Sequence, residues 1–360
     1  MTRFVLFLFA VGIFVVPVQA QQKESADTTS VAADDDWLVL PFASYAPETK
    51  LAGGIVGGYY RPERAGRPAS SIQTTVTITQ KRQLIVQATP ELYLAEGRWR
   101  VQGELQGSHF PDSFFGIGPA TPARAEEEYT ARYVYVDGAA QRRLSPRLRV
   151  GPRLYARVGS VDPETDAGLI AENRVIGADG GQTLGVGASA LWDARNSLYY
   201  PTDGSYGEGV VTLYSAAWGS DFTFGQFKTD LRGYRSLGPG ALAAQVYAEA
   251  VVGDAPFQLR PLFGGAERMR GYREGRFRDD LYWTTQAEYR FPLFWRFKGV
   301  AFASLGQVGS RIGPSLVEHV EGAVGLGGRL RLTEGGVHGR LDVAYGRTGV
   351  ELYIALGEAF

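Results

Sequence analysis

The chain has 360 residues, of which 44% are hydrophobic, and its mean hydropathy is -0.13. Because no second long apolar run follows the N-terminal one, these values exclude a helical membrane protein, and 37 Lys and Arg residues against 38 Asp and Glu residues give no sign of a nucleic-acid partner. The absence of Cys excludes a disulfide framework and a lipid-anchored thiol.

The first twenty residues have the three-part pattern of a secretory signal peptide. Arg3 precedes an apolar run over residues 4–16, and residues 18–20 supply a cleavage site. The run is too short to favour a transmembrane anchor. We therefore expect residues 1–20 to be a signal peptide and the polar stretch 21–36 to be a short disordered periplasmic leader.

From Trp37 onward, the chain consists of alternating segments of roughly ten residues, which is typical of the strands of a transmembrane β-barrel. Gly, Pro, Asn and charged clusters divide the segments. The pattern predicts an all-β fold, a sixteen-stranded antiparallel transmembrane barrel over residues 37–360. The expected strands are 37–45, 50–61, 69–80, 82–95, 97–108, 127–143, 146–160, 180–192, 205–217, 221–236, 240–253, 280–291, 295–309, 318–332, 336–347 and 349–360.

The alternation of residue types is explicit in the later strands. In residues 283–291, Trp283 and Tyr289 fall on one face and Gln286 and Glu288 on the other. One face suits lipid and the other suits a water-filled lumen. The same split places Leu341 and Val343 outside with Arg340 and Asp342 inside, and Val324 and Leu326 outside with Glu321 and Arg329 inside.

The links between strands also fit a barrel, in which short inner turns alternate with longer outer loops. If the first strand rises from the periplasm, the long links 109–126, 161–179 and 254–279 all fall on the outer side. Most inner links are short. The exception is the polar link 193–204.

The C-terminal segment 348–360 places Val350, Leu352, Ile354, Leu356 and Phe360 on one face of an extended strand. In a soluble domain, a strand that ends this way would leave an apolar edge open to other chains. As the last strand of a closed barrel, it pairs with the first strand and leaves no open edge. A C-terminal strand packed on an ordinary core is the alternative.

Several motifs occur in an order that resembles a known family. They are Ser44-Tyr-Ala-Pro-Glu-Thr49, Phe114-Phe-Gly-Ile-Gly118, the segment from Trp192 to Gly204, Leu262-Phe-Gly-Gly-Ala-Glu-Arg-Met-Arg-Gly-Tyr272 and Gln286-Ala-Glu-Tyr-Arg-Phe-Pro-Leu293, with Phe360 at the end. Together they resemble the barrel of the BamA/TamA-type outer-membrane assembly superfamily, also called the bacterial surface antigen family.

The resemblance implies a sixteen-stranded barrel in which the extracellular loop after strand eleven folds into the lumen. Its tip would be Arg270, Gly271 and Tyr272, and the tip arginine of the family pairs with an acid on the inner wall. Ser304 stands where that acid is expected. Asp342, Glu288 and Glu321 lie on inward faces and are the candidate partners, because an unpaired guanidinium away from water is costly. Alternatively, Arg270 lies in a wide aqueous lumen without a partner.

A second departure concerns the N-terminal region. Family members that insert or translocate proteins usually carry polypeptide-transport-associated domains before the barrel, and others carry a patatin-like lipase domain. Residues 21–36 have room for neither, so an activity cannot be carried over from the fold alone.

No enzyme motif is found in the sequence. His109, His319 and His338 are isolated, no nucleophile elbow or phosphate-binding loop occurs, and the Gly-rich runs lie within alternating strands. We expect no enzymatic activity, no cofactor and no metal.

The sequence therefore predicts an integral protein of the bacterial outer membrane that takes part in protein or lipid insertion or translocation. The competing hypothesis is a passive pore or structural barrel, and a soluble secreted sandwich is a third. Expected partners are outer-membrane lipids and lipopolysaccharide, the barrel assembly machinery during biogenesis, for which Phe360 would be the C-terminal assembly signal, and a separate periplasmic protein.

Overall fold

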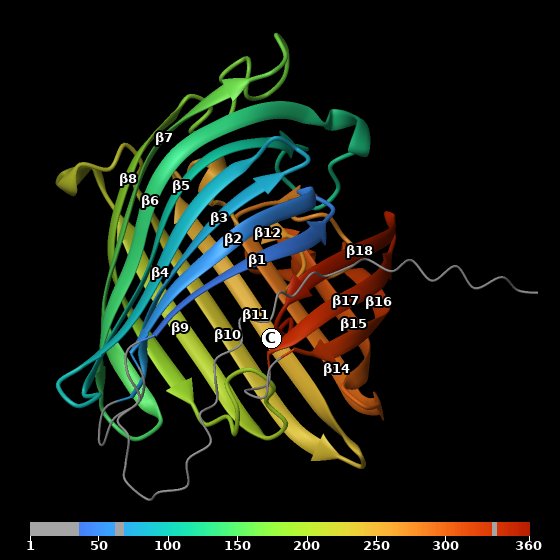
Figure 1. The fold of residues 1–360 in the computed structure, drawn as a ribbon. Coiled ribbons are helices and arrows are strands. Elements are labelled where there is room, and N and C mark those ends of the chain that lie inside the picture. The colour runs from blue at the N-terminus through green and yellow to red at the C-terminus, as the bar shows by residue number, and fades with distance from the viewer. Residues whose placement is uncertain (1–35, 62–67, 333–336) are drawn as a thin grey trace, which may run out of the picture. The chain divides into compact units, whose positions relative to one another are not determined.

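The computed structural model describes residues 36–61, 68–332 and 337–360, which form a closed antiparallel barrel of sixteen strands (Figure 1). This confirms the fold class predicted from the sequence. The predicted signal peptide and residues 21–35 of the predicted leader lie outside the described residues, as does the link 333–336. Asp36, assigned to the leader, begins the first strand.

The barrel strands follow one another around the wall in chain order, and a two-stranded hairpin, β12 and β13, lies within the link between β11 and β14. The strands are β1 (Asp36–Ala46), β2 (Lys50–Arg61), β3 (Ser70–Thr79), β4 (Leu84–Leu94), β5 (Trp99–Phe114), β6 (Glu127–Arg143), β7 (Leu148–Pro163), β8 (Gly180–Asp193), β9 (Gly204–Tyr214), β10 (Phe224–Leu237), β11 (Gly240–Gly253), β12 (Leu262–Phe263), β13 (Phe277–Arg278), β14 (Leu281–Phe294), β15 (Phe297–Gly309), β16 (Glu321–Arg331), β17 (His338–Gly346) and β18 (Gly349–Leu356). The short 3-10 helices are η1 (Ala123–Ala125), η2 (Ala216–Trp218), η3 (Phe257–Leu259) and η4 (Pro314–Val317).

Most predicted strand boundaries lie close to the observed ones, and two do not. Strand β5 continues to Phe114, so the first part of the predicted loop 109–126 belongs to the wall. Strand β18 ends at Leu356, so the predicted strand 349–360 is too long. Gly357 has φ of 82°, a left-handed conformation that glycine adopts readily, and it turns the last residues away from the wall.

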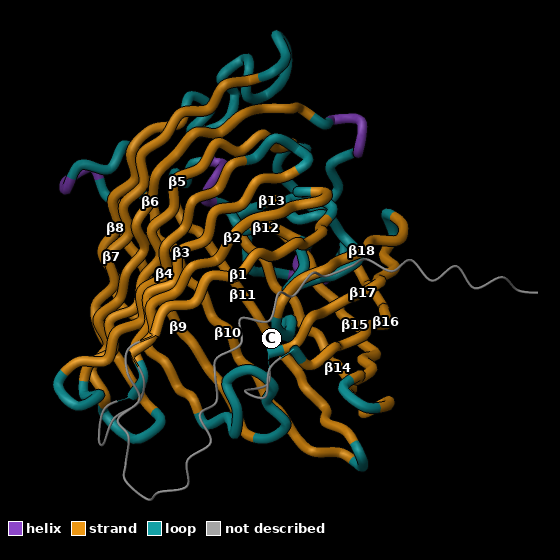
Figure 2. Tube along the Cα trace, in the orientation of Figure 1, coloured by secondary structure: helices purple, strands orange, loops and turns teal. Residues whose placement is uncertain are grey.

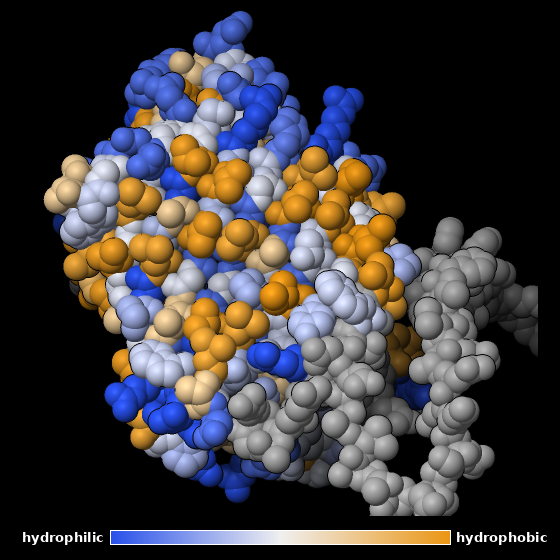
Figure 3. Space-filling view, turned by 60° about the vertical axis from the view of Figure 1, so that its left-hand side comes forward, coloured by the Kyte–Doolittle hydropathy of each residue, from blue (hydrophilic) through white to orange (hydrophobic). Residues whose placement is uncertain are grey.

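Burial alternates along the strands as the sequence predicts. In β14, Thr284, Gln286 and Glu288 are buried, while Thr285 and Ala287 between them are exposed. In β17, Arg340 and Asp342 are buried and Leu341 and Val343 are exposed. Apolar side chains cover the middle of the face shown in Figure 3, with hydrophilic residues at both ends, as a lipid-facing band requires.

The links between strands differ in length at the two ends of the barrel (Figure 2). We call the end where β1 begins the inner end and the opposite end the outer end. The long links 115–126, 164–179 and 254–280 are at the outer end, and the link 194–203 is the long one at the inner end. In the described part of the chain, no helix is long and apolar enough to cross a membrane.

Strands β1 and β18 close the barrel through a short seam. Strand β1 pairs with β2 along its whole length, from Asp36 to Ala46, but its only register pair with β18 is Tyr45 with Ile354. Figure 1 shows the two strands approaching at the outer end and diverging toward the inner end. Among the described residues, the register pairs of residues 39–44 of β1 are therefore all with β2.

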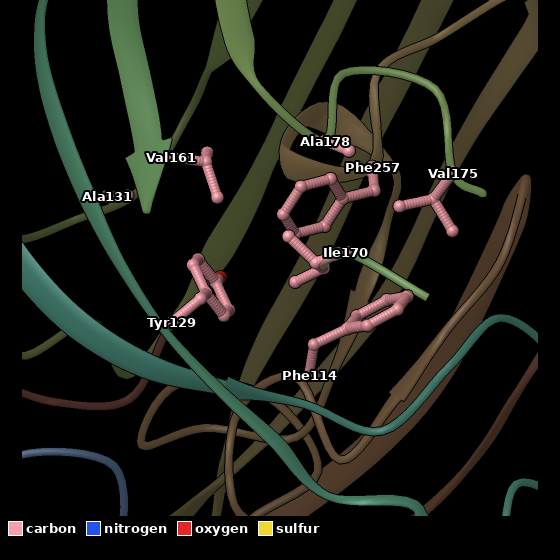
Figure 4. Close-up of a cluster of buried hydrophobic side chains, with 8 residues drawn as sticks. All are labelled: Phe114, Tyr129, Ala131, Val161, Ile170, Val175, Ala178 and Phe257. Atoms are coloured by element: carbon pink, nitrogen blue, oxygen red, sulfur yellow. The ribbon is translucent and has the colours of Figure 1, made fainter. Parts of the chain in front are cut away.

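A cluster of apolar side chains covers the outer mouth (Figure 4). Ile170, Val175 and Ala178 of the link 164–179 pack with Phe257 of η3 and with Phe114 at the end of β5. The carboxylate of Glu127 accepts hydrogen bonds from three successive backbone N–H groups, those of residues 169–171, at 2.8, 2.9 and 3.0 Å. The link is thus anchored over the mouth by both apolar and polar contacts.

Candidate functional site

The candidate site is the loop between β11 and β14, residues 254–280, which enters the lumen and returns through the hairpin of β12 and β13. Backbone hydrogen bonds from Gly265 to Tyr272, 3.0 Å, and from Gly275 to Phe263, 2.9 Å, hold the hairpin closed. Met269, Arg270, Gly271 and Tyr272 form its tip, and all four are buried against the inner wall.

Glycine at the tip is required by both conformation and space. Gly271 has φ of 106°, and a Cβ at this position would lie 3.1 Å from Cβ of Ala323 and 3.2 Å from the backbone N of Gly346. Gly346 of β17, on the wall side of this contact, must also be glycine, because a Cβ there would lie 2.7 Å from the Tyr272 ring. The tip therefore docks directly on the backbones of β16 and β17.

Arg270 lies between two carboxylates of the inner wall. Its Nη1 is 2.7 Å from Oδ2 of Asp342, its Nη2 contacts Oε1 of Glu288, and its guanidinium lies 3.6 Å from the centre of the Phe302 ring. The Arg270, Glu288 and Asp342 side chains are fully buried. Charge-assisted hydrogen bonds on two sides and an aromatic face on a third compensate the loss of water around the guanidinium.

The three acids predicted as partners of Arg270, and Ser304 at the position of the expected acid, have different surroundings. Asp342 and Glu288 contact Arg270, whereas Glu321 pairs with Arg347 and accepts a hydrogen bond of 2.8 Å from the Tyr272 hydroxyl. Ser304 is buried, and its Oγ has no hydrogen-bond partner among the described residues. On the same strand, Phe302 supplies the ring against the guanidinium.

Tyr272 and the backbone of the tip are held by β16, by the turn that follows β17 and by β18. The Tyr272 hydroxyl also accepts a hydrogen bond from the backbone N–H of Arg347, 3.0 Å. The Tyr353 hydroxyl of β18 accepts from the N–H of Gly271, 3.0 Å, and donates to the carbonyl of Tyr272, 3.1 Å. The loop is therefore bonded to β18, one of the two strands of the seam.

Sequence reasoning missed that the charged contacts continue beyond Arg270. Nε of Arg290 lies 2.9 Å from Oε2 of Glu288, Arg329 pairs with Asp342, and Nε of Arg329 lies 2.7 Å from Oε2 of Glu358. Alternation had placed Arg329 on the inner wall, and Arg290 has the same parity as the inward-facing Glu288. Glu358 gave no such signal, because it follows the turn at Gly357.

Phe360 lies inside the barrel instead of on the lipid-facing surface where the strand pattern placed it. It packs with Tyr234 of β10 and Ala243 of β11, and its carbonyl oxygen accepts a hydrogen bond of 2.8 Å from Arg290. The turn at Gly357 directs the residues after it into the barrel, which allows Phe360 to reach this position.

The loop leaves part of the lumen open on the side of β5 to β10. A cavity of about 450 Å³ is lined there by polar and charged side chains, among them Glu104, Asp137, Arg153, Asp230 and Arg268. Acids and bases alternate around it. Within the described residues, no group of three or more His, Cys, Asp or Glu side chains could hold a metal ion.

At the outer end, two acids of different links lie close enough to influence each other. Burial raises the pKa of Glu48, in the turn between β1 and β2. The side chain of Glu274 still reaches solvent, but the protein around it, together with the charge of Glu48, raises its pKa to about 7. Both acids favour the protonated form here more than they do in water.

A family model identifies the barrel, since the Omp85 superfamily domain matches residues 69–357. The chain belongs to the Omp85 superfamily. A search of curated proteins finds no match. Family membership places this Omp85 barrel in the bacterial outer membrane, as the sequence predicts.

Solved structures show the same fold at low sequence identity. BamA from Haemophilus ducreyi lacking POTRA domains 1-3 matches with a TM-score of 0.65 at 12% identity, over 90% of this chain and 70% of that one. CdiB from Escherichia coli matches with a TM-score of 0.59 at 13% identity, over 89% of this chain and 63% of that one. CdiB from Acinetobacter baumannii matches with a TM-score of 0.56 at 13% identity, over 89% and 59%. The Omp85 barrel thus spans less than two thirds of either CdiB chain.

Proposed function

We propose that this Omp85 barrel takes part in inserting or translocating proteins or lipids at the outer membrane, and that it does so without enzymatic activity. The observation that carries the proposal is the seam, in which β1 and β18 share the single register pair of Tyr45 and Ile354. An unpaired strand edge in a membrane can be satisfied by pairing with an incoming strand. Similarity to BamA, and the resemblance to the assembly family, support this role.

The test is to close the seam covalently. The chain has no Cys, so Tyr45→Cys with Ile354→Cys introduces one pair of thiols at the register pair. We expect oxidation to block insertion of a radiolabelled outer-membrane barrel protein into proteoliposomes and reduction to restore it. Tyr45→Cys alone is the control. Equal insertion by the oxidised and reduced double variant would contradict the proposal.

A passive pore is the second candidate, and the polar cavity of about 450 Å³ favours it. The two functions differ in electrical behaviour. A pore conducts steadily with the loop in place, whereas an assembly barrel conducts only after the loop is removed. Single-channel recording of the intact protein and of a variant lacking residues 264–276 separates them.

We further propose the following arrangement in the cell. Residues 1–20 are removed as a signal peptide, residues 21–36 form a short leader, and the barrel lies among outer-membrane lipids and lipopolysaccharide. The barrel assembly machinery folds it, and a separate periplasmic protein works with it. Pull-down from crosslinked envelopes, with a barrel of another family as the control, tests for that partner.

A further inference from the structure

The cavity on the side of β5 to β10 has a lining in which acids and bases are equal in number. Its volume of about 450 Å³ lies within the range of roughly 300–1,000 Å³ that is typical of small-molecule sites. Four carboxylates and four cationic side chains line it, together with the rings of Tyr206 and Tyr247. Asp137 and Lys228 keep 30% and 34% of their side-chain surface exposed, so solvent reaches the wall.

Most of these charges already have partners within the wall. The ion pairs are Asp137 with Arg153, Asp230 with Arg232, and Lys228 with Glu249. The two remaining carboxylates of the lining, Glu104 and Glu208, accept hydrogen bonds from the hydroxyl groups of Tyr135 and Tyr206. The wall therefore presents many polar atoms with no excess of either charge.

Two arginines of the lining have donors that the wall does not use. Arg268, which the loop 254–280 brings into the cavity, forms no ion pair among the described residues, and its guanidinium lies 3.9 Å from the centre of the Tyr247 ring. The Arg153 side chain is only 9% exposed, and its Nε has no hydrogen-bond partner among the described residues. Buried donors of this kind gain when a ligand or water supplies an acceptor.

The equal numbers of acids and bases bear on the charge of a ligand. They give the cavity no preference for either sign. A charged ligand would have to separate one of the ion pairs to gain a partner of its own, and this would leave an opposite charge unpaired. A hydroxyl group both donates and accepts, so it bonds to carboxylates and guanidinium groups without separating them.

We propose that the cavity binds a neutral, soluble oligosaccharide. A sugar ring carries several hydroxyl groups, which match the mixed lining, and apolar C–H faces, for which Tyr206 and Tyr247 supply flat apolar surface. Because Arg268 belongs to the loop, the bound sugar contacts the loop as well as the wall. The site goes beyond the proposed function and does not rest on it, since sugar binding can be measured without any client protein.

Equilibrium dialysis of the full chain tests the proposal. The protein is refolded in lauryldimethylamine oxide, because a detergent with a sugar headgroup would compete. The probes are the neutral trisaccharides maltotriose, cellotriose and raffinose, with trigalacturonate and the glucosamine trimer as charged comparators. We expect saturable binding of at least one neutral trisaccharide, and binding of both charged trimers that is several-fold weaker.

A single thiol locates the binding in this cysteine-free chain. Ser189 is a buried residue of the cavity wall, and Ser189→Cys changes its size little. The trisaccharide that binds should slow alkylation of this thiol by iodoacetamide several-fold. Ala217→Cys, at an exposed position of η2 in an outer link, is the control and should react at the same rate with and without the sugar.

Filling the cavity should abolish binding. Ala139→Leu adds apolar volume at a residue of the lining, and we expect it to lower trisaccharide binding several-fold. Ala244→Leu is the matched control, because Ala244 is exposed on the opposite face of β11 and the substitution adds the same atoms outside the lumen. Heat-modifiable migration shows whether both variants are folded. If Ala139→Leu does not fold, protection of the thiol at position 189 still tests the site.

Purified lipopolysaccharide separates the two sources of a sugar, free in solution or attached to a lipid. The cavity is enclosed by the barrel wall, so we expect lipopolysaccharide not to compete with the trisaccharide, and competition would overturn the assignment to a soluble ligand. The proposal is also overturned if none of the three neutral trisaccharides binds, if a charged trimer binds more tightly, or if binding leaves the thiol at position 189 unprotected.

Discussion

At the level of single residues, the buried charges at the loop tip lie in close contact with one another. Arg270 is enclosed by Asp342, Glu288 and the Phe302 ring, and Arg290 and Arg329 contact the same two carboxylates. Such a group is held firmly only while every member is present, because each deletion leaves an opposite charge unpaired in a site with little water.

Arg270→Ala should therefore release the tip. We expect a loss of roughly 3–5 kcal/mol in the free energy of unfolding, typical of a broken buried pair, and faster cleavage of residues 254–280 by protease. Asp342→Asn should give a similar defect, and the double variant should be little worse than either single one. Strictly additive effects in heat-modifiability assays would contradict the pairing.

Ser304→Asp tests whether the acid expected on β15 can replace Asp342. Ser304 is buried beside Phe302 on the same inner face, and its Oγ has no hydrogen-bond partner among the described residues. We expect Ser304→Asp to raise the melting temperature of Asp342→Asn toward that of the parent. Ser304→Asn, which is similar in size but neutral, should not.

Gly346→Ala should disturb docking by steric contact alone. Its Cβ would lie 2.7 Å from the Tyr272 ring and from the carbonyl oxygen of Gly271, and overpacking of this kind costs roughly 1–3 kcal/mol. Gly209→Ala is the matched control, because a Cβ there meets nothing within 4 Å. Equal melting temperatures for the two variants would show that the tip is not tightly packed.

At the level of elements, each strand has one face for lipid and one for the lumen, and the loop is fitted to the lumen face of β14 to β18. The contacts of Tyr272 and Tyr353 bond the loop to β16, to the turn between β17 and β18 and to β18. The loop is thus joined by hydrogen bonds to one of the two strands that form the seam.

Leu326→Arg should impair assembly, because Leu326 is 67% exposed on the lipid face of β16. A charge near the bilayer midplane costs roughly 2–4 kcal/mol. Ala139→Arg, in the wall of the polar cavity, is the tolerated counterpart, because Ala139 is buried and lies on the inward face of β6 together with Asp137. Membrane fractionation compares the two, and the reverse order would overturn the assignment of faces.

Alternation alone predicts that Arg329→Leu is tolerated, but Arg329 binds Asp342 and Glu358, so we expect this substitution to be destabilising.

The loop should dock more weakly as the pH rises through the titration of Glu274. Its pKa of about 7 in the folded protein exceeds the ordinary 4.5, so the folded state binds the proton more tightly. The free energy of unfolding should then be highest below about 4.5 and fall as the pH approaches about 7. Its charged neighbours are Glu48, Glu267, Asp112 and Arg268. Melting temperatures of Glu274→Gln should lack this part of the pH dependence, and identical profiles for variant and parent would refute it.

At the level of the whole molecule, segments of the chain lie at both ends of the barrel. The link 164–179 packs on η3 at the outer end, and residues 357–360 lie inside the barrel against β10 and β11 at the inner end. Opening at the seam requires the loss of a single register pair between the described residues of β1 and β18.

Deleting Phe360 should lower the yield of folded barrel in cells, because we propose that the assembly machinery reads this residue. Phe360 also packs against Tyr234 and Ala243, so some stability is lost in detergent as well. Phe360→Tyr keeps an aromatic ring and is the control. The proposal predicts a much larger loss in cells than in refolding experiments, and a deletion that assembles normally in cells would refute it.

The sequence by itself determined the number of barrel strands, the faces of those strands and the position of the long loops. These features depend on local periodicity and turn residues, which a chain carries wherever it lies in space. The tertiary structure decided which inward acids contact Arg270, because Asp342, Glu288 and Glu321 share the same alternation and differ only in their distance across the lumen. It also decided the position of Phe360 and the length of the seam, since a turn at Gly357 and the closure of β1 on β18 depend on contacts between residues far apart in the chain.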